Sequence, residues 1–138
     1  MKKKTIQELQ LGDVAKTTVK VTEDLVKLFA EVSGDNNPVH LDEEYASATP
    51  FKSRIAHGML VGSLFSKLLG TELPGEGTIY LEQNLRFLKP VYLGDEVTAT
   101  VSIKELLTEK NRVYFDTVAT NQNDDVVVSG TAVVLAPR

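Results

Sequence analysis

Alternating apolar and polar residues predict strands over the second half of the chain. Residues 78–88, 96–106, 112–121 and 126–135 form four such stretches, separated by segments with turn-forming residues. A fifth strand is predicted at 15–21, where the same alternation occurs near the N-terminus. Side chains two positions apart share a face of a strand, so two strands are each predicted to present an apolar face. These faces comprise Ile79, Leu81, Leu85 and Phe87 in the first stretch, and Val97, Ala99, Val101 and Ile103 in the second.

Helices are predicted in the first half. Thr22 is a suitable N-cap for a helix that ends at Gly34, and Pro38 predicts a non-helical loop over 34–40, because proline lacks an amide hydrogen and drives the preceding residue toward extended geometry. Asp42 is predicted to cap a short helix that runs to about residue 48. The first helix is predicted to bury one apolar stripe, formed by Leu25, Leu28, Phe29 and Val32.

The most informative helix is predicted over 57–69. Apolar residues occupy nearly every side of it, which predicts a helix enclosed by protein. Three small residues are predicted to let a neighbouring element approach its backbone closely: Gly62, Ser63 and Ser66. The predicted fold class is α+β, a single domain over residues 1–138 in which a five-stranded, mostly antiparallel sheet wraps around the central helix that starts near His57.

Composition and charge narrow the range of functions. The chain has 138 residues, no cysteine and a formal net charge of -4. The lack of cysteine excludes thiolate nucleophiles, disulfides and cysteine-ligated metal centres. The acidic balance argues against a nucleic-acid partner, which requires a concentrated basic face. No apolar run is suited to spanning a membrane or to a signal peptide, so a soluble, cytoplasmic protein without a membrane partner is expected.

Two titratable side chains flank Pro38 in the predicted loop. Asp35 and His40 could supply the proton acceptor and the proton donor that an acid/base enzyme needs. The alternative interpretation is that Asp35 makes a turn hydrogen bond and His40 packs, and the spacing alone favours this alternative. A metal site formed by Asp35, His40 and His57 lacks helical ligand spacing, so no metal is expected.

Gly58 follows His57 at the start of the central helix. Unpaired amide hydrogens lie at this positive end, and a glycine lets a thioester oxygen approach the backbone, which is the geometry of an oxyanion site. The alternative is that Gly58 only permits tight packing and that His57 only caps the helix. No dinucleotide fingerprint, phosphate-binding loop or nucleophile elbow is present in the sequence.

Two segments resemble the signatures of a known family. Residues 34–40, Gly-Asp-Asn-Asn-Pro-Val-His, are similar to the hydratase motif of the MaoC-like (R)-specific enoyl-CoA hydratases, which have the hot-dog fold. Phe51 with residues 55–59, Ile-Ala-His-Gly-Met, resembles the second signature at the start of the central helix. Further similar segments extend the resemblance over nearly the whole chain. Lys52 departs from the pattern, because many relatives have a small residue there.

The resemblance implies an activity and a site. Asp35 and His40 would together activate one water molecule for syn addition to a trans-2-enoyl-CoA, which gives an (R)-3-hydroxyacyl-CoA. Asp35 would be the ionised base and His40 would return the proton to C2. The amide of Gly58 would hold the thioester oxygen as an oxyanion donor. Three further residues are expected to bind substrate, Asn37, His57 and Ser66, and no cofactor is implied.

The resemblance also implies a homodimer with a continuous sheet, acting on an acyl-CoA thioester. Three alternatives stay open: a dehydratase acting on 3-hydroxyacyl groups carried by acyl carrier protein, a hot-dog acyl-CoA thioesterase, and a non-catalytic subunit that binds acyl thioesters. The intact pair of Asp35 and His40 argues against the last alternative, because binding alone needs neither.

Overall fold

The computed structural model describes residues 1–138 and contains one five-stranded sheet. The strands lie in the order β1-β3-β4-β5-β2, and every neighbouring pair is antiparallel, so the predicted sheet is confirmed. β1 and β2 are therefore the two edges. The bounds are β1 (Val14–Lys20), β2 (Ile79–Phe87), β3 (Glu96–Leu107), β4 (Arg112–Thr120) and β5 (Val126–Leu135).

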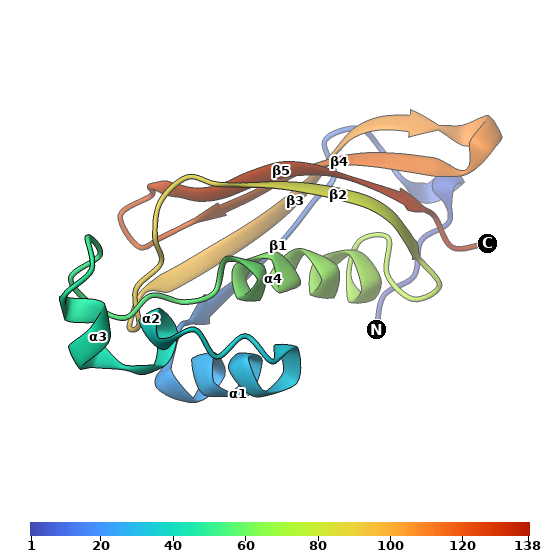
Figure 1. Cartoon of the computed structure of the whole chain (residues 1–138). Coiled ribbons are helices and arrows are strands. Elements are labelled where there is room, and N and C mark those ends of the chain that lie inside the picture. Colours follow the sequence, from blue (N-terminus) through green and yellow to red (C-terminus); the bar gives the residue numbers. More distant parts are fainter.

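Four α-helices accompany the sheet, α1 (Glu23–Ser33), α2 (Pro38–Leu41), α3 (Glu43–Ser47) and α4 (Gly58–Thr71), with two single 3₁₀ turns at Ile6–Glu8 and Thr108–Lys110. Figure 1 shows the sheet arching over α4, with α1, α2 and α3 beyond that helix. This is the hot-dog arrangement expected from the sequence. None of the helices combines the length and the apolar composition that crossing a bilayer requires.

The core fills the space between α4 and the inner face of the sheet. Phe65 and Leu68 of α4 and Phe115 of β4 are completely buried there. Gly62 of α4 permits close packing, since a Cβ atom on this residue would lie 2.8 Å from the Leu85 side chain of β2. The predicted apolar face of β3 is confirmed, because Val97, Ala99, Val101 and Ile103 are all buried.

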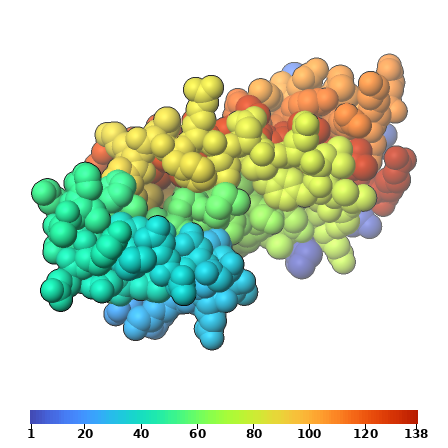
Figure 2. Space-filling view, viewed as in Figure 1, coloured from blue at the N-terminus to red at the C-terminus, as the bar shows by residue number.

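The prediction that protein encloses α4 on all sides is wrong for one face. Met59 is 58% exposed, and Ser63 and Ser66 are exposed as well, so these two serines do not receive a neighbouring element. Figure 2 shows this part of α4 at the bottom of a hollow between β2 and α1. An open helix face next to an edge strand leaves room for a ligand or a second chain.

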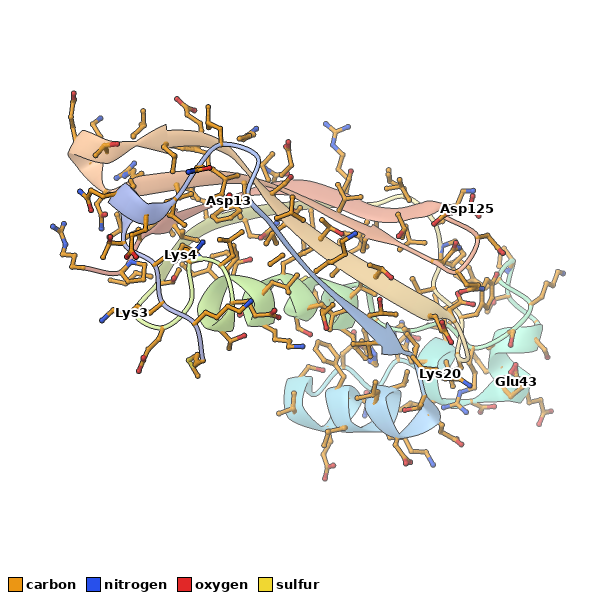
Figure 3. All side chains as sticks on the ribbon, turned by 180° about the vertical axis from the view of Figure 1, so that it is seen from behind. Lys3, Lys4, Asp13, Lys20, Glu43 and Asp125 are labelled. Atoms are coloured by element: carbon orange, nitrogen blue, oxygen red, sulfur yellow. The ribbon has the colours of Figure 1, made fainter.

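The N-terminal strand has the one wet face that its alternation predicts. Ala15, Thr17 and Val19 are half-buried, whereas the residues between them are exposed. Two of the exposed residues are Lys16 and Lys20, and Figure 3 shows Lys20 at the end of β1. Charged side chains on an edge strand oppose pairing with another strand.

α1 has the predicted caps but is rotated relative to the predicted stripe. Thr22 accepts a hydrogen bond from the amide of Leu25 at 3.2 Å, and Gly34 ends the helix with φ of 78°. Leu28 and Val32, however, are 61% and 81% exposed. Leu25 and Phe29, the other two residues of the stripe, are partly buried against the core, and Val26 and Ala30 are buried beside them. The inward face of α1 is therefore turned away from Leu28 and Val32 but still includes half of the predicted stripe.

β2 contains a bulge that the alternation did not predict. The register against β5 shifts between Tyr80 and Glu82, which makes Leu81 the extra residue. The extra residue exchanges the two faces of the strand, so Ile79 lies on the opposite face from Leu85 and Phe87. Tyr80 and Gln83 take the inward positions, and the predicted common face of Ile79, Leu81, Leu85 and Phe87 is wrong.

The segment around Pro38 is also helical where a loop was predicted. Pro38 begins α2, and Asn37 caps it by accepting a hydrogen bond from the amide of Val39 at 3.2 Å. Proline is tolerated at the first helical position, because the amide hydrogen that it lacks would have no partner there. His40 therefore lies in a helical turn. The second cap prediction is confirmed, since Asp42 accepts from the amide of Tyr45 at the start of α3.

Candidate active site

A series of tight turns directs the chain from α1 to α2. The hydroxyl of Ser33 accepts from the amide of Asp35 at 3.1 Å, and the Asp35 carboxylate accepts from the amide of Asn37 at 3.2 Å. The Asn37 side chain then caps α2. Each bond is local, as expected for short polar side chains that compete with the helix for backbone groups.

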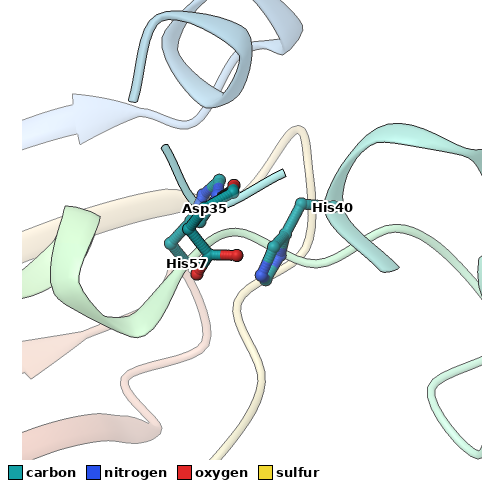
Figure 4. A group of neighbouring side chains, drawn as sticks. All are labelled: Asp35, His40 and His57. Carbon is teal, nitrogen blue, oxygen red and sulfur yellow. Dashed lines mark hydrogen bonds between the residues drawn. The ribbon is translucent and has the colours of Figure 1, made fainter. Parts of the chain in front are cut away.

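These turns bring Asp35 and His40 together with His57. A carboxylate oxygen of Asp35 and a ring nitrogen of each histidine all lie within 4.8 Å of one another. Figure 4 shows the Asp35 carboxylate directed toward the His40 ring. Asp35 is exposed, whereas His40 and His57 are 8% and 2% exposed. A water molecule sits about 2.8 Å from each hydrogen-bond partner, so one water can contact two groups at this separation.

The hydrogen bonds of His40 fix which of its nitrogens faces the site. Nδ1 lies 2.7 Å from the carbonyl oxygen of Ile55. A carbonyl only accepts, so Nδ1 carries the proton in the neutral ring and Nε2 keeps its lone pair. Burial lowers the pKa of His40, the proximity of His57 lowers this pKa further, and the Ile55 carbonyl and Asp35 oppose the shift. His40 is therefore a neutral base at pH 7.

Arg54 forms a hydrogen bond with the backbone of His40. Its Nε donates to the His40 carbonyl at 2.8 Å, and its Nη1 pairs with Glu23 of α1 at 3.0 Å. The same contact with Arg54 is the main reason that the pKa of the Glu23 carboxyl is lowered. This ion pair links the start of α1 to the end of α2.

Gly58 presents the first amide of α4 to the same site. This amide has no acceptor in the protein, as is usual for the first turn of a helix. The Phe87 ring lies against the glycine, and a Cβ atom at position 58 would be 2.5 Å from it. The glycine therefore leaves space for both the ring and an approaching ligand oxygen.

The site opens into a pocket of about 500 Å³ at the start of α4. Asp35, His40, His57 and Gly58 all line it. Its walls are mostly apolar, and the sequence did not identify the contribution of residues 87–91, which follow the inward face of β2 and cover one side. Residues 88–91 lie beyond the end of β2, so the alternation along that strand does not place them.

Two other predicted site residues lie apart from this pocket. Ser66 lines an adjoining groove of about 410 Å³ between α4, β2 and Phe29 of α1, and Met59 lines both spaces. Gln83 faces the groove, where it accepts from the Tyr80 hydroxyl and donates to Thr117 at 3.0 Å. Asn37 lines neither space, and its side-chain oxygen caps α2. The substrate-binding roles of Ser66 and Asn37 stay predictions.

The side chains of Asp35, His40 and His57 are also of the types that coordinate metal ions. The rings of His40 and His57 stack with centroids 3.8 Å apart and planes inclined by 27°. A metal ion binds in the plane of an imidazole, about 2.0–2.1 Å from its nitrogen. Two nearly parallel rings at this spacing do not direct their lone pairs to one point. The geometry therefore suits a shared water better than a metal ion.

Comparisons with known proteins agree with this geometry. The model of a family described as "MaoC like domain" matches residues 7–128. An (R)-specific enoyl-CoA hydratase from Rhodospirillum rubrum is 48% identical over 96% of this chain and 89% of its own length. A mitochondrial 3-hydroxyacyl-[acyl-carrier-protein] dehydratase from Arabidopsis thaliana is 39% identical over 94% of this chain and 79% of its own.

A solved structure extends the similarity to three dimensions. An R-hydratase from Pseudomonas aeruginosa in the unliganded form superimposes with a TM-score of 0.93 and 50% sequence identity, over 97% of this chain and 86% of its own. Fold and sequence are thus similar over nearly the full length. The chain belongs to the MaoC-like domain family.

Proposed function

We propose that this chain is an (R)-specific enoyl-CoA hydratase, a hydro-lyase that adds water reversibly to a trans-2-enoyl-CoA with syn geometry. The product is an (R)-3-hydroxyacyl-CoA. The observation that carries the proposal is the convergence of Asp35 and His40 beside the unpaired amide of Gly58 in one mostly apolar pocket. Addition of water to a conjugated thioester requires an acid/base group and an oxyanion donor in this arrangement.

The proton path runs through His40, which takes the role of base that the resemblance gave to Asp35, because Nε2 of the neutral His40 ring has a free lone pair. One water molecule bridges the Asp35 carboxylate and Nε2 of His40. Neutral His40 accepts a proton from this water while the oxygen forms its bond to C3, and the Asp35 carboxylate stabilises the positive charge on the ring. The imidazolium then gives the proton to C2 on the same face, which restores neutral His40 and makes the addition syn.

The Gly58 amide acts on the other end of the conjugated system. When the hydroxyl adds to C3, the electrons of the double bond move toward the carbonyl, and negative charge builds on the thioester oxygen. An amide at the positive end of α4 stabilises this charge without reorganising. The acyl chain beyond C3 extends along the open face of α4 toward Ser66.

We further propose that the active form is a homodimer that joins two copies of β2. β2 is an edge strand that exposes three neighbouring apolar or aromatic residues, Ile79, Tyr80 and Leu81, beside the charged Glu82 and Arg86, whereas the exposed charges of the other edge, β1, are Lys16 and Lys20. Exposed apolar side chains on an unpaired edge favour association, and charged ones oppose it. Pairing at β2 would also cover the groove beside α4.

The direct test is an activity assay with the purified chain. Crotonyl-CoA and longer trans-2-enoyl-CoA esters are supplied, loss of the conjugated enoyl absorbance is followed, and the product is resolved by chiral analysis. We expect hydration to the (R)-alcohol without release of free thiol. Release of free thiol without hydration of the double bond would identify a thioesterase instead. An (S) product would contradict the proposed site.

The second candidate is a dehydratase acting on acyl carrier protein, which the similarity to the relative from Arabidopsis thaliana supports. The same residues would carry out the reverse reaction, so the two functions differ in the carrier and not in the chemistry. Measuring kcat/KM for the same acyl group on coenzyme A and on acyl carrier protein separates them. We expect the higher value with coenzyme A.

A further inference from the structure

His57 is linked to Asp35, His40 and Gly58 of the proposed catalytic site and is almost fully buried. The residue is the N-cap of α4 and precedes Gly58, its ring stacks on His40, and its Nε2 lies 2.9 Å from the carbonyl oxygen of Asp35. Only 2% of His57 is exposed. These contacts connect three groups that come from three different elements of the chain.

We propose that His57 is a positioning residue, which holds Asp35 and His40 in register with the Gly58 amide through the hydrogen bond that its Nε2–H donates to the Asp35 carbonyl. This inference rests on the proposed hydratase function. The sequence led us to expect that His57 contacts the substrate, but a ring that is almost fully buried offers a substrate little surface. We therefore assign His57 an indirect role, in which it acts by holding Asp35 and His40 in place.

The hydrogen bond to His57 is the long-range restraint on the Asp35 turn. The other hydrogen bonds of residues 34–37 join partners no more than four positions apart. Local bonds shape a turn but do not fix its distance from another element. The bond from His57 spans 22 positions and ties the turn to the start of α4, where the oxyanion donor lies.

The contacts of His57 fix which ring nitrogen carries the proton and how the ring is oriented. The Asp35 carbonyl only accepts, so Nε2 carries the proton, and Nδ1 is buried without a hydrogen-bond partner. Phe29 lies on the ring at a centroid distance of 5.0 Å and an angle of 53°, and His40 stacks at 3.8 Å. The ring therefore stays fixed between two neighbours while it donates to Asp35.

Two substitutions separate the hydrogen bond from the packing. In His57→Gln the side-chain amide nitrogen can occupy the position of Nε2 and donate to the Asp35 carbonyl, whereas the aromatic ring is lost. In His57→Phe a ring of similar size can remain between Phe29 and His40, whereas the donor is lost. His57→Asn serves as a third variant, because its amide nitrogen matches Nδ1 and does not reach the carbonyl.

Steady-state hydration of crotonyl-CoA is measured for the wild type and the three variants. We expect His57→Phe and His57→Asn to lose about 100-fold in kcat, the order of loss that a misplacement of about 1 Å produces, with little change in KM. His57→Gln should stay within a few-fold of the wild type. A wild-type kcat in His57→Phe with a low kcat in His57→Gln would mean that ring packing matters and would overturn the proposal. A raised KM with unchanged kcat in all three variants would instead indicate that His57 contacts the substrate, and it would overturn the proposal.

Hydrogen–deuterium exchange of the peptide that covers the Asp35 turn provides a readout that needs no activity. We expect faster exchange in His57→Phe and His57→Asn than in the wild type and His57→Gln, since the restraint on the turn is lost. Circular dichroism confirms that each variant is folded. If the wild type hydrates no enoyl thioester, the proposed function fails, while equal exchange in all four proteins shows separately that His57 does not position the turn.

Discussion

The surroundings of His40 set both its pKa and the nitrogen that carries its proton. Burial lowers its pKa, and the Ile55 carbonyl holds the proton on Nδ1, so Nε2 is a lone-pair acceptor at neutral pH. The adjacent Asp35 favours the charged ring, but to a smaller extent than burial opposes it. A base that is neutral at rest and charged only during the reaction suits a proton relay.

The lowered pKa of His40 predicts a pH-dependent stability. The folded-state pKa lies below the ordinary value of 6.5, so the unfolded chain binds more protons as the pH falls below 6.5. The free energy of unfolding should therefore fall from about pH 7 toward about pH 5. Urea denaturation at both pH values should show a smaller decrease in His40→Asn, whose amide can keep the bond to Ile55 but does not titrate. An equal decrease in both proteins would contradict the shift.

The catalytic roles proposed for Asp35 and His40 predict large losses of activity on substitution. We expect Asp35→Asn and His40→Ala each to lower kcat by at least about 100-fold, the usual contribution of a positioned acid/base group, while the fold is retained. Glu31→Gln, which changes an exposed carboxylate of α1, is the matched control and should keep full activity. Retained turnover in both catalytic variants would refute the assignment.

At the scale of elements, α2 is a single turn whose start depends on one side chain. Asn37 accepts from the amide of Val39, and His40 is the third residue of the capped turn. We expect Asn37→Ala to lower the free energy of unfolding by about 1 kcal/mol and to lower kcat, because the cap is lost. Asn37→Ser keeps an acceptor and should retain most of both. Raised KM in both variants with unchanged stability would instead indicate a substrate contact.

Two glycines of α4 differ in what surrounds them, and this predicts that alanine substitution affects stability differently at the two positions. A Cβ atom at Gly70 meets nothing within 4 Å, whereas one at Gly62 meets the Leu85 side chain at 2.8 Å. Gly70→Ala should raise the free energy of unfolding by up to about 1 kcal/mol through helix propensity. Gly62→Ala should gain less or lose stability. Chemical denaturation of both variants measures these changes in the free energy of unfolding. Equal increases in the two variants would show that the Leu85 side chain moves aside at little cost.

At the scale of the whole molecule, the two edges of the sheet are unlike. The proposed dimer predicts that Leu81→Lys, which places a charge among the exposed apolar residues 79–81 of β2, gives a monomer in analytical ultracentrifugation. Leu28→Lys changes an apolar residue that is exposed on α1, and it should leave the dimer intact. A monomeric wild type would exclude the proposed dimer. Dissociation by Leu28→Lys but not by Leu81→Lys would place the interface away from β2.

The sequence by itself determined the features that depend on near neighbours. The caps at Thr22 and Asp42, the end of α1 at Gly34 and the buried face of β3 follow from local bonding and from alternation, and all are confirmed. The fold class followed from the sum of these elements, and the two short signatures identified the family.

Tertiary structure decided what depends on register and distance. The bulge at Leu81 exchanges the faces of β2 and brings Gln83 inward, and pairing with β5 sets it, not any pattern within the strand. The rotation that exposes Leu28 follows from the packing of α1. The meeting of Asp35 with His57, 22 positions away, is likewise a property of the folded chain. Local sequence sets local geometry, whereas the approach of distant segments depends on the packing of all elements at once.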